Sequence, residues 1–198
     1  MPEVTMNRAA PLSAAEKLIL DTLLAGQPAA AEALARELLR SEPDNGVALA
    51  LRSFALGEEL AAAGELARAG LRAEYLAHAA RVVAQLAPER VRPDPPVRQI
   101  QLAALADAHG VTARERYAAA GSPAELAAAL RVVDDSIAVC GSTRALREVR
   151  ALCLLRLGQA PEAEPLIDEL LRADPAETRA LRRELAAALR APRPTPAA

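Results

Sequence analysis

The chain has 198 residues, of which 52% are apolar, 25% charged and 2% aromatic, and its formal net charge is -2. These values exclude a disordered polymer, a collagen-like chain and a strongly basic protein that binds polyanions. The sequence contains 50 alanines and 31 leucines against one phenylalanine, two tyrosines and no tryptophan. Because alanine and leucine favour helices, whereas strands favour β-branched and aromatic residues, the composition predicts an all-α fold.

The N-terminal residues 1–11 do not resemble a signal peptide, because Glu3 precedes the first basic residue, Arg8. No stretch of about 18 residues is free of charge, so we expect no membrane-spanning segment. The two cysteines, Cys140 and Cys153, are too few for a disulfide framework and are expected to be free thiols in or near the core. We therefore predict a flexible N-terminus over 1–11 and a cytoplasmic location.

Two segments far apart in the chain repeat one pattern. Segments 26–43 and 158–175 each begin with glycine and end with proline, and ten of their eighteen positions are identical. Small or apolar residues stand 5, 8, 9 and 12 positions after each glycine, a spacing that places them on one face of an α-helix. An apolar helical pattern precedes each glycine, and proline ends the second helix because it lacks an amide donor. The repeating unit is therefore a helix, a glycine turn, a second helix and a proline stop.

Two weaker copies of this unit lie between the strong ones, with their glycines at Gly64 and Gly121 and without a closing proline. Segment 88–97 contains four prolines and cannot continue a helix. We predict that it is a linker between two sets of helical repeats, over residues 12–87 and 98–190.

The second half is expected to begin with a short helix over 98–109, which Gly110 ends. Its last part carries a stripe of leucines at helical spacing, Leu181, Leu185 and Leu189. Such a helix covers the last apolar face of a repeat array, so we predict a C-terminal capping helix. The tail 191–198 is expected to be disordered.

Taken together, these residues resemble the tetratricopeptide repeat, a helical hairpin of about 34 residues. The family places a small residue in the first helix, glycine at the turn, alanine in the second helix and proline at the end. The matching positions are Gly26, Ala31 and Pro43 in the first copy and Ala151, Gly158, Ala163 and Pro175 in the last. The resemblance implies a right-handed α-solenoid of about four helical hairpins, closed by the capping helix.

The resemblance also implies that the first helix of each hairpin lines a concave groove for an extended peptide or a partner helix. Carried over residue by residue, the groove positions are Glu16, Leu20, Leu23, Phe54, Glu58, Ala61, Glu115, Ala118, Glu148, Leu152, Leu155 and Arg156. The set is apolar with a glutamate in every repeat, so we expect a basic or amphipathic segment of another protein as the partner. Phe54 is expected to be either the most valuable groove contact or an ordinary core residue between repeats.

The expected function is therefore non-catalytic: a scaffold, an adaptor or a chaperone that binds another protein. Two alternatives stay open at this point. In the first, the chain is an accessory or regulatory subunit of an enzyme complex. In the second, it is a homo-oligomeric structural protein whose groove receives another copy of the chain.

No residue pattern indicates an enzyme, a cofactor or a metal site. His78 and His109 lack a metal-binding spacing to any His, Cys or acidic residue, and His109 is expected to lie at a helix end. Asp134 and Asp135 are adjacent, so on a helix they point about 100° apart and do not converge on a substrate. The sequence has no glycine-rich nucleotide loop and no nucleophile elbow.

Three arginines, Arg144, Arg147 and Arg150, recur at every third position of a predicted helix. Such a row can contact phosphate, but the charge is balanced overall and few aromatic residues are present to stack on bases. We therefore predict a solvated helix face and no nucleic-acid partner.

Overall fold

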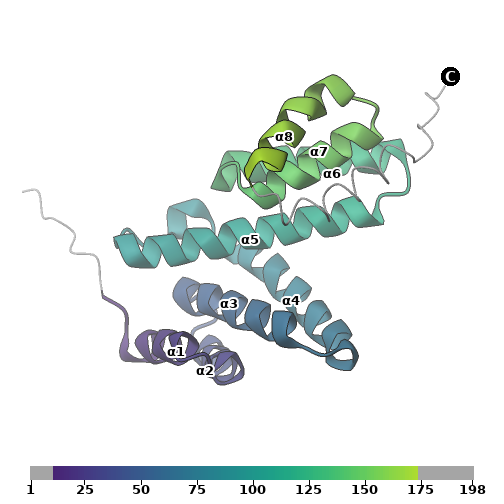
Figure 1. Cartoon of the computed structure of the whole chain (residues 1–198). Coiled ribbons are helices and arrows are strands. Elements are labelled where there is room, and N and C mark those ends of the chain that lie inside the picture. Colours follow the sequence, from purple (N-terminus) through teal and green to yellow (C-terminus); the bar gives the residue numbers. More distant parts are fainter. Residues whose placement is uncertain (1–10, 174–198) are drawn as a thin grey trace, which may run out of the picture. The chain divides into compact units, whose positions relative to one another are not determined.

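The structure is a computed structural model that describes residues 11–173. Its regular elements in this range are all helical, which confirms the all-α prediction. They are α1 (Ala14–Leu24), α2 (Pro28–Ser41), α3 (Gly46–Ala62), α4 (Glu65–Gln85), the 3-10 helix η1 (Pro88–Arg90), α5 (Pro95–Ala119), α6 (Pro123–Cys140), α7 (Arg144–Arg156) and α8 (Ala160–Ala173) (Figure 1). They form two compact units, and the division between the units falls within α5, after Ala108.

The glycine turns predicted for the two strong repeats are confirmed. Gly26 joins α1 to α2 and Gly158 joins α7 to α8, with φ angles of 70° and 79°. Residues with a side chain rarely adopt this left-handed conformation, which explains glycine at both turns. The helix α2 ends at Ser41, shortly before Pro43, as the proline stop predicts.

The two weaker copies also form pairs of helices joined by short turns. Gly64 is the N-cap of α4, directly after α3. Gly121 precedes Ser122, whose side chain forms a capping box with Glu125 at the start of α6. Residues 11–173 thus contain four successive helix pairs, and the stacking of these pairs into a right-handed solenoid stays a prediction.

Alanines allow the helices of the first unit to approach closely. The helix α2 packs against α1 and α3, and α1 also contacts α3. Ala31 and Ala35 of α2 and Ala55 of α3 are fully buried in one apolar cluster with Ile19 of α1. The alanine that the repeat places in its second helix is therefore in the core, both at Ala31 and at its equivalent in the last repeat, Ala163.

The core of the second unit joins α5, α6 and α7. Its central cluster consists of Ala113, Ala129, Val133, Leu146, Val149 and Cys153. Burial raises the pKa of the Cys153 thiol to about 11, so this thiol is protonated at neutral pH. Cys140 is half-buried at the end of α6, and both cysteines are free thiols, as predicted.

The prediction that Gly110 ends a helix is wrong, because α5 continues through it to Ala119. Gly110 is buried, and a Cβ at this position would lie 3.1 Å from the Cβ of Ala145 on α7. The glycine therefore permits close packing of two helices and does not form a cap. His109 is likewise inside α5 and not at its end, and its Nδ1 lies 2.8 Å from the Ser136 hydroxyl on α6.

The segment 88–97, predicted as a linker, is packed into the first unit. The Arg92 guanidinium lies 3.0 Å from a carboxylate oxygen of Glu16 and donates a 2.9 Å hydrogen bond to the Pro11 carbonyl. The backbone amide of Arg92 also donates to the side chain of Gln101, which is buried. The prolines do interrupt the helices, but the chain that contains them is held in place by these bonds.

Three predicted features lie outside the described residues, wholly or in part. They are residues 1–10 of the flexible N-terminus, the capping helix with Leu181, Leu185 and Leu189, and the tail 191–198.

We expect two glycines inside helices to respond oppositely to alanine. Gly70→Ala in α4 should raise the free energy of unfolding by about 0.5–1 kcal/mol, because alanine favours a helix and the new methyl group meets no atom within 4 Å. Gly110→Ala should not raise the free energy of unfolding, because the new methyl group would crowd Ala145. Denaturant unfolding of both variants tests this difference, and an equal gain at the two positions would contradict the close packing of α5 against α7.

Candidate functional site

Three of the predicted groove residues meet in one surface pocket of the first unit. Phe54, Glu58 and Ala61 stand at helical spacing on one face of α3. Together with Tyr75 of α4 and Asp107 of α5 they line a pocket of about 350 Å³. Its other lining residues are Ser53 and Gly57. We call this the α3 pocket.

A hydrogen bond between α4 and α5 forms one wall of the α3 pocket. The Tyr75 hydroxyl donates to the carboxylate of Asp107. Burial raises the pKa of Tyr75, and the Asp107 carboxylate raises it further, so the phenol stays protonated at neutral pH. Since a protonated phenol can donate to a carboxylate, the hydrogen bond in this wall is retained at neutral pH.

The two carboxylates of the α3 pocket have no cationic partner among residues 11–173. Glu58 is exposed and forms no ion pair there, and Asp107 accepts only the Tyr75 hydroxyl. Other acids of the same unit are paired with arginine, as Glu16 is with Arg92. The pocket therefore presents uncompensated negative charge next to the half-buried ring of Phe54.

Ser53 adds a buried hydroxyl without a hydrogen-bond partner. The residue is 2% exposed, and its Oγ has no partner in the structure. The carbonyl four residues earlier, that of Leu49, is the usual acceptor for a serine in a helix, but here it accepts from His78 at 2.9 Å. A buried polar atom without a partner costs free energy, so its presence in a pocket wall calls for an explanation.

Next to Ser53, a network of ion pairs holds α2, α3 and α4 together. The Arg52 guanidinium of α3 lies 2.8 Å from Glu32 on α2 and 2.6 Å from Glu74 on α4. Glu32 is buried and also forms two hydrogen bonds with Arg36. Burial raises the pKa of the neighbouring Glu59, and the carboxylates of Glu32 and Glu74 raise it further.

His78 of α4 lies against this network as a neutral side chain. Its Nε2 donates to the Leu49 carbonyl, and its Nδ1 lies 3.4 Å from the Arg52 guanidinium. Burial lowers the pKa of His78 to about 4, the bond to Leu49 opposes this shift, and the charge of Arg52 adds to it. Protonation would place two cations face to face in a buried site, so His78 is a structural residue of the α3–α4 contact.

The predicted groove residues of α1 belong to the interior of the first unit. Glu16 is buried and accepts hydrogen bonds from Ser13, Asn45 and Arg92. Burial alone would raise the pKa of Glu16, but these donors outweigh it and lower that pKa. Leu20 and Leu23 are half-buried and pack against the apolar cluster of the unit, so the side chains of α1 serve the core.

In the second unit, several of the predicted groove residues are buried or bonded within the unit. Leu152 is 1% exposed and forms a buried cluster with Leu170, against which Leu155 packs. The remaining groove residues of the unit are Glu115, which is half-buried, Ala118, which is exposed, and Glu148 and Arg156, which have side-chain partners. Burial leaves Leu152 unavailable to an open groove.

Glu148 and Arg156 stabilise contacts inside the second unit. The carboxylate of Glu148 lies 2.6 Å from Arg114 of α5 and 3.3 Å from Arg144 of α7. The Arg156 guanidinium lies 5.3 Å from the ring centre of Tyr117, a cation–π distance, and donates to the Ala120 carbonyl.

The row of arginines on α7 is paired with acids. Arg144 bonds Glu148 within the helix, Arg147 pairs with Glu169, and Arg150 lies 2.7 Å from Asp134. These pairs use the side chains that a phosphate-binding face would need free; the three arginines are half-buried and ion-paired, which the predicted solvated face did not include.

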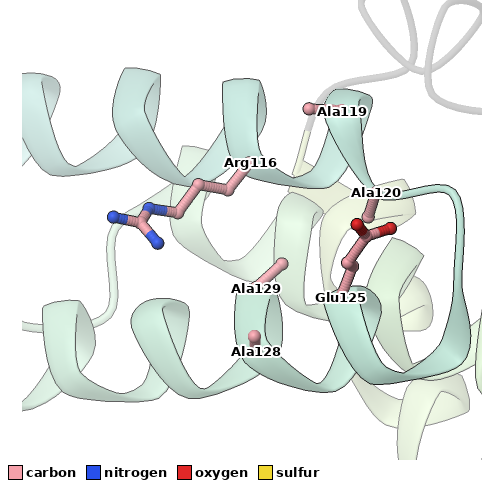
Figure 2. A pocket seen from close by; sticks show the side chains of 6 residues that line it. All are labelled: Arg116, Ala119, Ala120, Glu125, Ala128 and Ala129. Atoms are coloured by element: carbon pink, nitrogen blue, oxygen red, sulfur yellow. The ribbon is translucent and has the colours of Figure 1, made fainter.

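A second pocket, of about 210 Å³, lies between α5 and α6 in the second unit (Figure 2). Its lining residues are Arg116, Ala119, Ala120, Glu125, Ala128 and Ala129. Glu125 accepts hydrogen bonds from the backbone amides of Gly121 and Ser122, and Figure 2 shows Arg116 pointing away from it. The Glu125 carboxylate already caps α6, so this pocket has fewer acceptors available to a ligand than the α3 pocket.

Sequence reasoning missed Ser53, Tyr75 and Asp107 as pocket residues. The resemblance assigns the groove to the first helix of each hairpin, whereas Tyr75 belongs to a second helix and Asp107 to the helix predicted to end nearby. The available signals were weak: Tyr75 is one of two tyrosines in the chain, and Ser53 directly precedes its one phenylalanine.

Comparison of the chain with protein-family models, with curated proteins and with solved structures gives no match. No helix in the range 11–173 combines the length and the apolar character that a membrane-spanning helix requires. Within that range, no group of three or more His, Cys, Asp or Glu side chains is placed to hold a metal ion.

We expect His78 to make the stability of the protein depend on pH. Its pKa is about 4 in the folded chain against 6.5 for an ordinary histidine, so its contribution is complete above pH 6.5 and is lost as the pH falls toward 4. At full extent this amounts to about 3 kcal/mol. The free energy of unfolding should therefore fall more steeply over this range in the wild type than in His78→Gln.

Denaturant unfolding at closely spaced pH values measures this difference. Glu16, Glu59 and His109 titrate in both proteins, so their contributions cancel in the comparison. Parallel pH profiles for wild type and variant would show that His78 is not held neutral by the fold.

Proposed function

We propose that the chain is a non-catalytic scaffold, adaptor or chaperone that binds a basic or amphipathic segment of another protein at the α3 pocket. The observation that carries this proposal is the combination of a half-buried aromatic ring with carboxylates that have no cationic partner in the described chain. Apolar side chains of a partner would be buried against Phe54 and Ala61, at roughly 25 cal/mol per Å² of apolar surface. Its cations would be attracted by Glu58 and Asp107.

The charges of the first unit support this choice of partner. Glu16 and Glu32 are buried and satisfied by arginine, which leaves them little attraction for an external cation. Glu58 is exposed, lines the pocket and has no cationic partner in the described chain. The proposal therefore rests on α3 and on the residues of α4 and α5 that line the pocket with it, and not on a groove that runs along all four helix pairs.

The first test concerns Phe54 and uses a synthetic amphipathic peptide of leucine and lysine as the probe. Phe54→Ala should weaken peptide binding at least about tenfold, because a pocket-lining aromatic residue is the usual anchor of a protein interface. The free energy of unfolding should change much less than in Leu56→Ala, a fully buried neighbour on α3 whose truncation costs about 2–5 kcal/mol.

Fluorescence anisotropy with labelled peptide measures the binding, and thermal unfolding measures the stability. Unchanged affinity in Phe54→Ala would remove the α3 pocket as the peptide site. A loss of stability equal to that of Leu56→Ala would make Phe54 a core residue.

The second test concerns the charge of the pocket. Glu58→Lys should weaken binding of the same peptide several-fold, and added salt should weaken binding to the wild type. The matched control is Glu164→Lys, the same charge change at an exposed position of α8 in the second unit. Equal effects of the two substitutions would show a response to net charge alone and would contradict a site at α3.

A further inference from the structure

We propose that the α3 pocket is a specific site for one guanidinium group, the side chain of an arginine in the bound partner. This inference rests on the proposed function and names the group that the pocket recognises. Its basis is the set of acceptors in the pocket, the aromatic surface beside them, and the space above Gly57.

The size of the pocket suits a single side chain. A volume of about 350 Å³ lies at the lower end of the range for small-molecule sites, and a whole helix does not fit into it. Gly57 helps to create this space, because a Cβ there would lie 4.0 Å from the Tyr75 hydroxyl, at ordinary contact distance. Any longer side chain at position 57 would enter the volume that the ligand needs.

The acceptors of the pocket match a donor that is planar and has several N–H groups. Asp107 accepts the Tyr75 hydroxyl through Oδ2, which leaves its other oxygen for a ligand. Glu58 supplies a second carboxylate. The buried hydroxyl of Ser53 has no partner within the chain, and a ligand N–H would satisfy its oxygen. A guanidinium group carries five N–H donors in one plane and can serve acceptors in several directions.

The aromatic surface favours a guanidinium over an ammonium group. Phe54 and Tyr75 both line the pocket, and a guanidinium group stacks on aromatic rings while its edge donates hydrogen bonds. An ammonium group is more strongly hydrated, so its transfer into a half-buried pocket costs more. The same unit already holds an arginine between two carboxylates: the side chain of Arg52 is 13% exposed, and its guanidinium pairs with Glu32 and Glu74.

The experiment uses the full chain and three probes that differ in one group: the N-acetyl methylamides of arginine, lysine and citrulline. Phe54 is the one phenylalanine of the chain, so NMR signals of a ¹³C-labelled phenylalanine ring report on the pocket without ambiguity. The arginine derivative should shift these signals in a saturable way, with an affinity at least about fivefold higher than that of the lysine derivative. The neutral citrulline derivative should cause no saturable shift.

Two variants locate the site. Asp107→Asn keeps an oxygen that accepts from Tyr75 but removes the negative charge. It should lower the affinity for the arginine derivative about tenfold. Gly57→Met should abolish the shift by filling the pocket, and methionine is a good helix former, so α3 is retained. The control is Gly70→Met on α4, where no atom lies within 4 Å of a Cβ, and it should bind as the wild type does.

Equal affinities for the arginine and lysine derivatives would overturn the guanidinium site, as would an unchanged affinity in Gly57→Met or the lack of any shift. None of these results would decide the proposed function, because the peptide that tests the proposed function contains lysine and no arginine. Failure of that peptide to bind would instead contradict the proposed function, so the two tests fail separately.

Discussion

The position of α3 depends on the guanidinium of Arg52, which joins Glu32 of α2 to Glu74 of α4. The side chains of Arg52 and Glu32 are 13% and 6% exposed, so this largely buried ion pair restrains α3 against α2, and the half-exposed Glu74 extends the contact to α4. Ser53 and Phe54 follow Arg52 directly in α3 and line the α3 pocket. The contact that holds the helices together therefore also fixes where the pocket residues point.

The shortage of aromatic residues shapes both the core and the site. Fully buried alanines such as Ala31, Ala35 and Ala55 let helices approach closely, and Gly110 permits the same between α5 and α7. In the site, the one phenylalanine of the chain lies half-buried beside Gly57 and supplies the pocket with an aromatic ring.

The sequence was informative about the elements because glycine and proline act locally. Gly26 and Gly158 determine their turns through the backbone angle that each can adopt, and this requires no knowledge of distant residues. The outcome at Gly110 depended instead on Ala145 of another helix, which no local pattern reveals. The prolines of 88–97 correctly indicated a break between helices, whereas the bonds of Arg92 that hold this segment to the first unit link residues far apart in the chain.

The same distinction explains the partial prediction of the site. Phe54, Glu58 and Ala61 share a face of one helix, so their spacing alone brings them together. The hydrogen bond between Tyr75 and Asp107 spans two helices and arises only when these pack. Likewise, the resemblance assigned both Glu16 and Glu58 to the groove, but Glu16 meets Arg92 and is buried, while Glu58 meets no cation in the described chain.

Charge pairing thus separates two kinds of acidic residue in the first unit. A carboxylate that is buried and bonded to arginine has its desolvation offset within the fold, and exchanging that arginine for an external cation brings no gain. A carboxylate at a pocket rim without such a partner retains its attraction for a ligand. Glu32 is of the first kind, and Glu58 and Asp107 are of the second. Because Glu16 and Glu58 were both assigned to the groove and only Glu16 is paired, the partners of these residues in space decide which of them can bind a ligand.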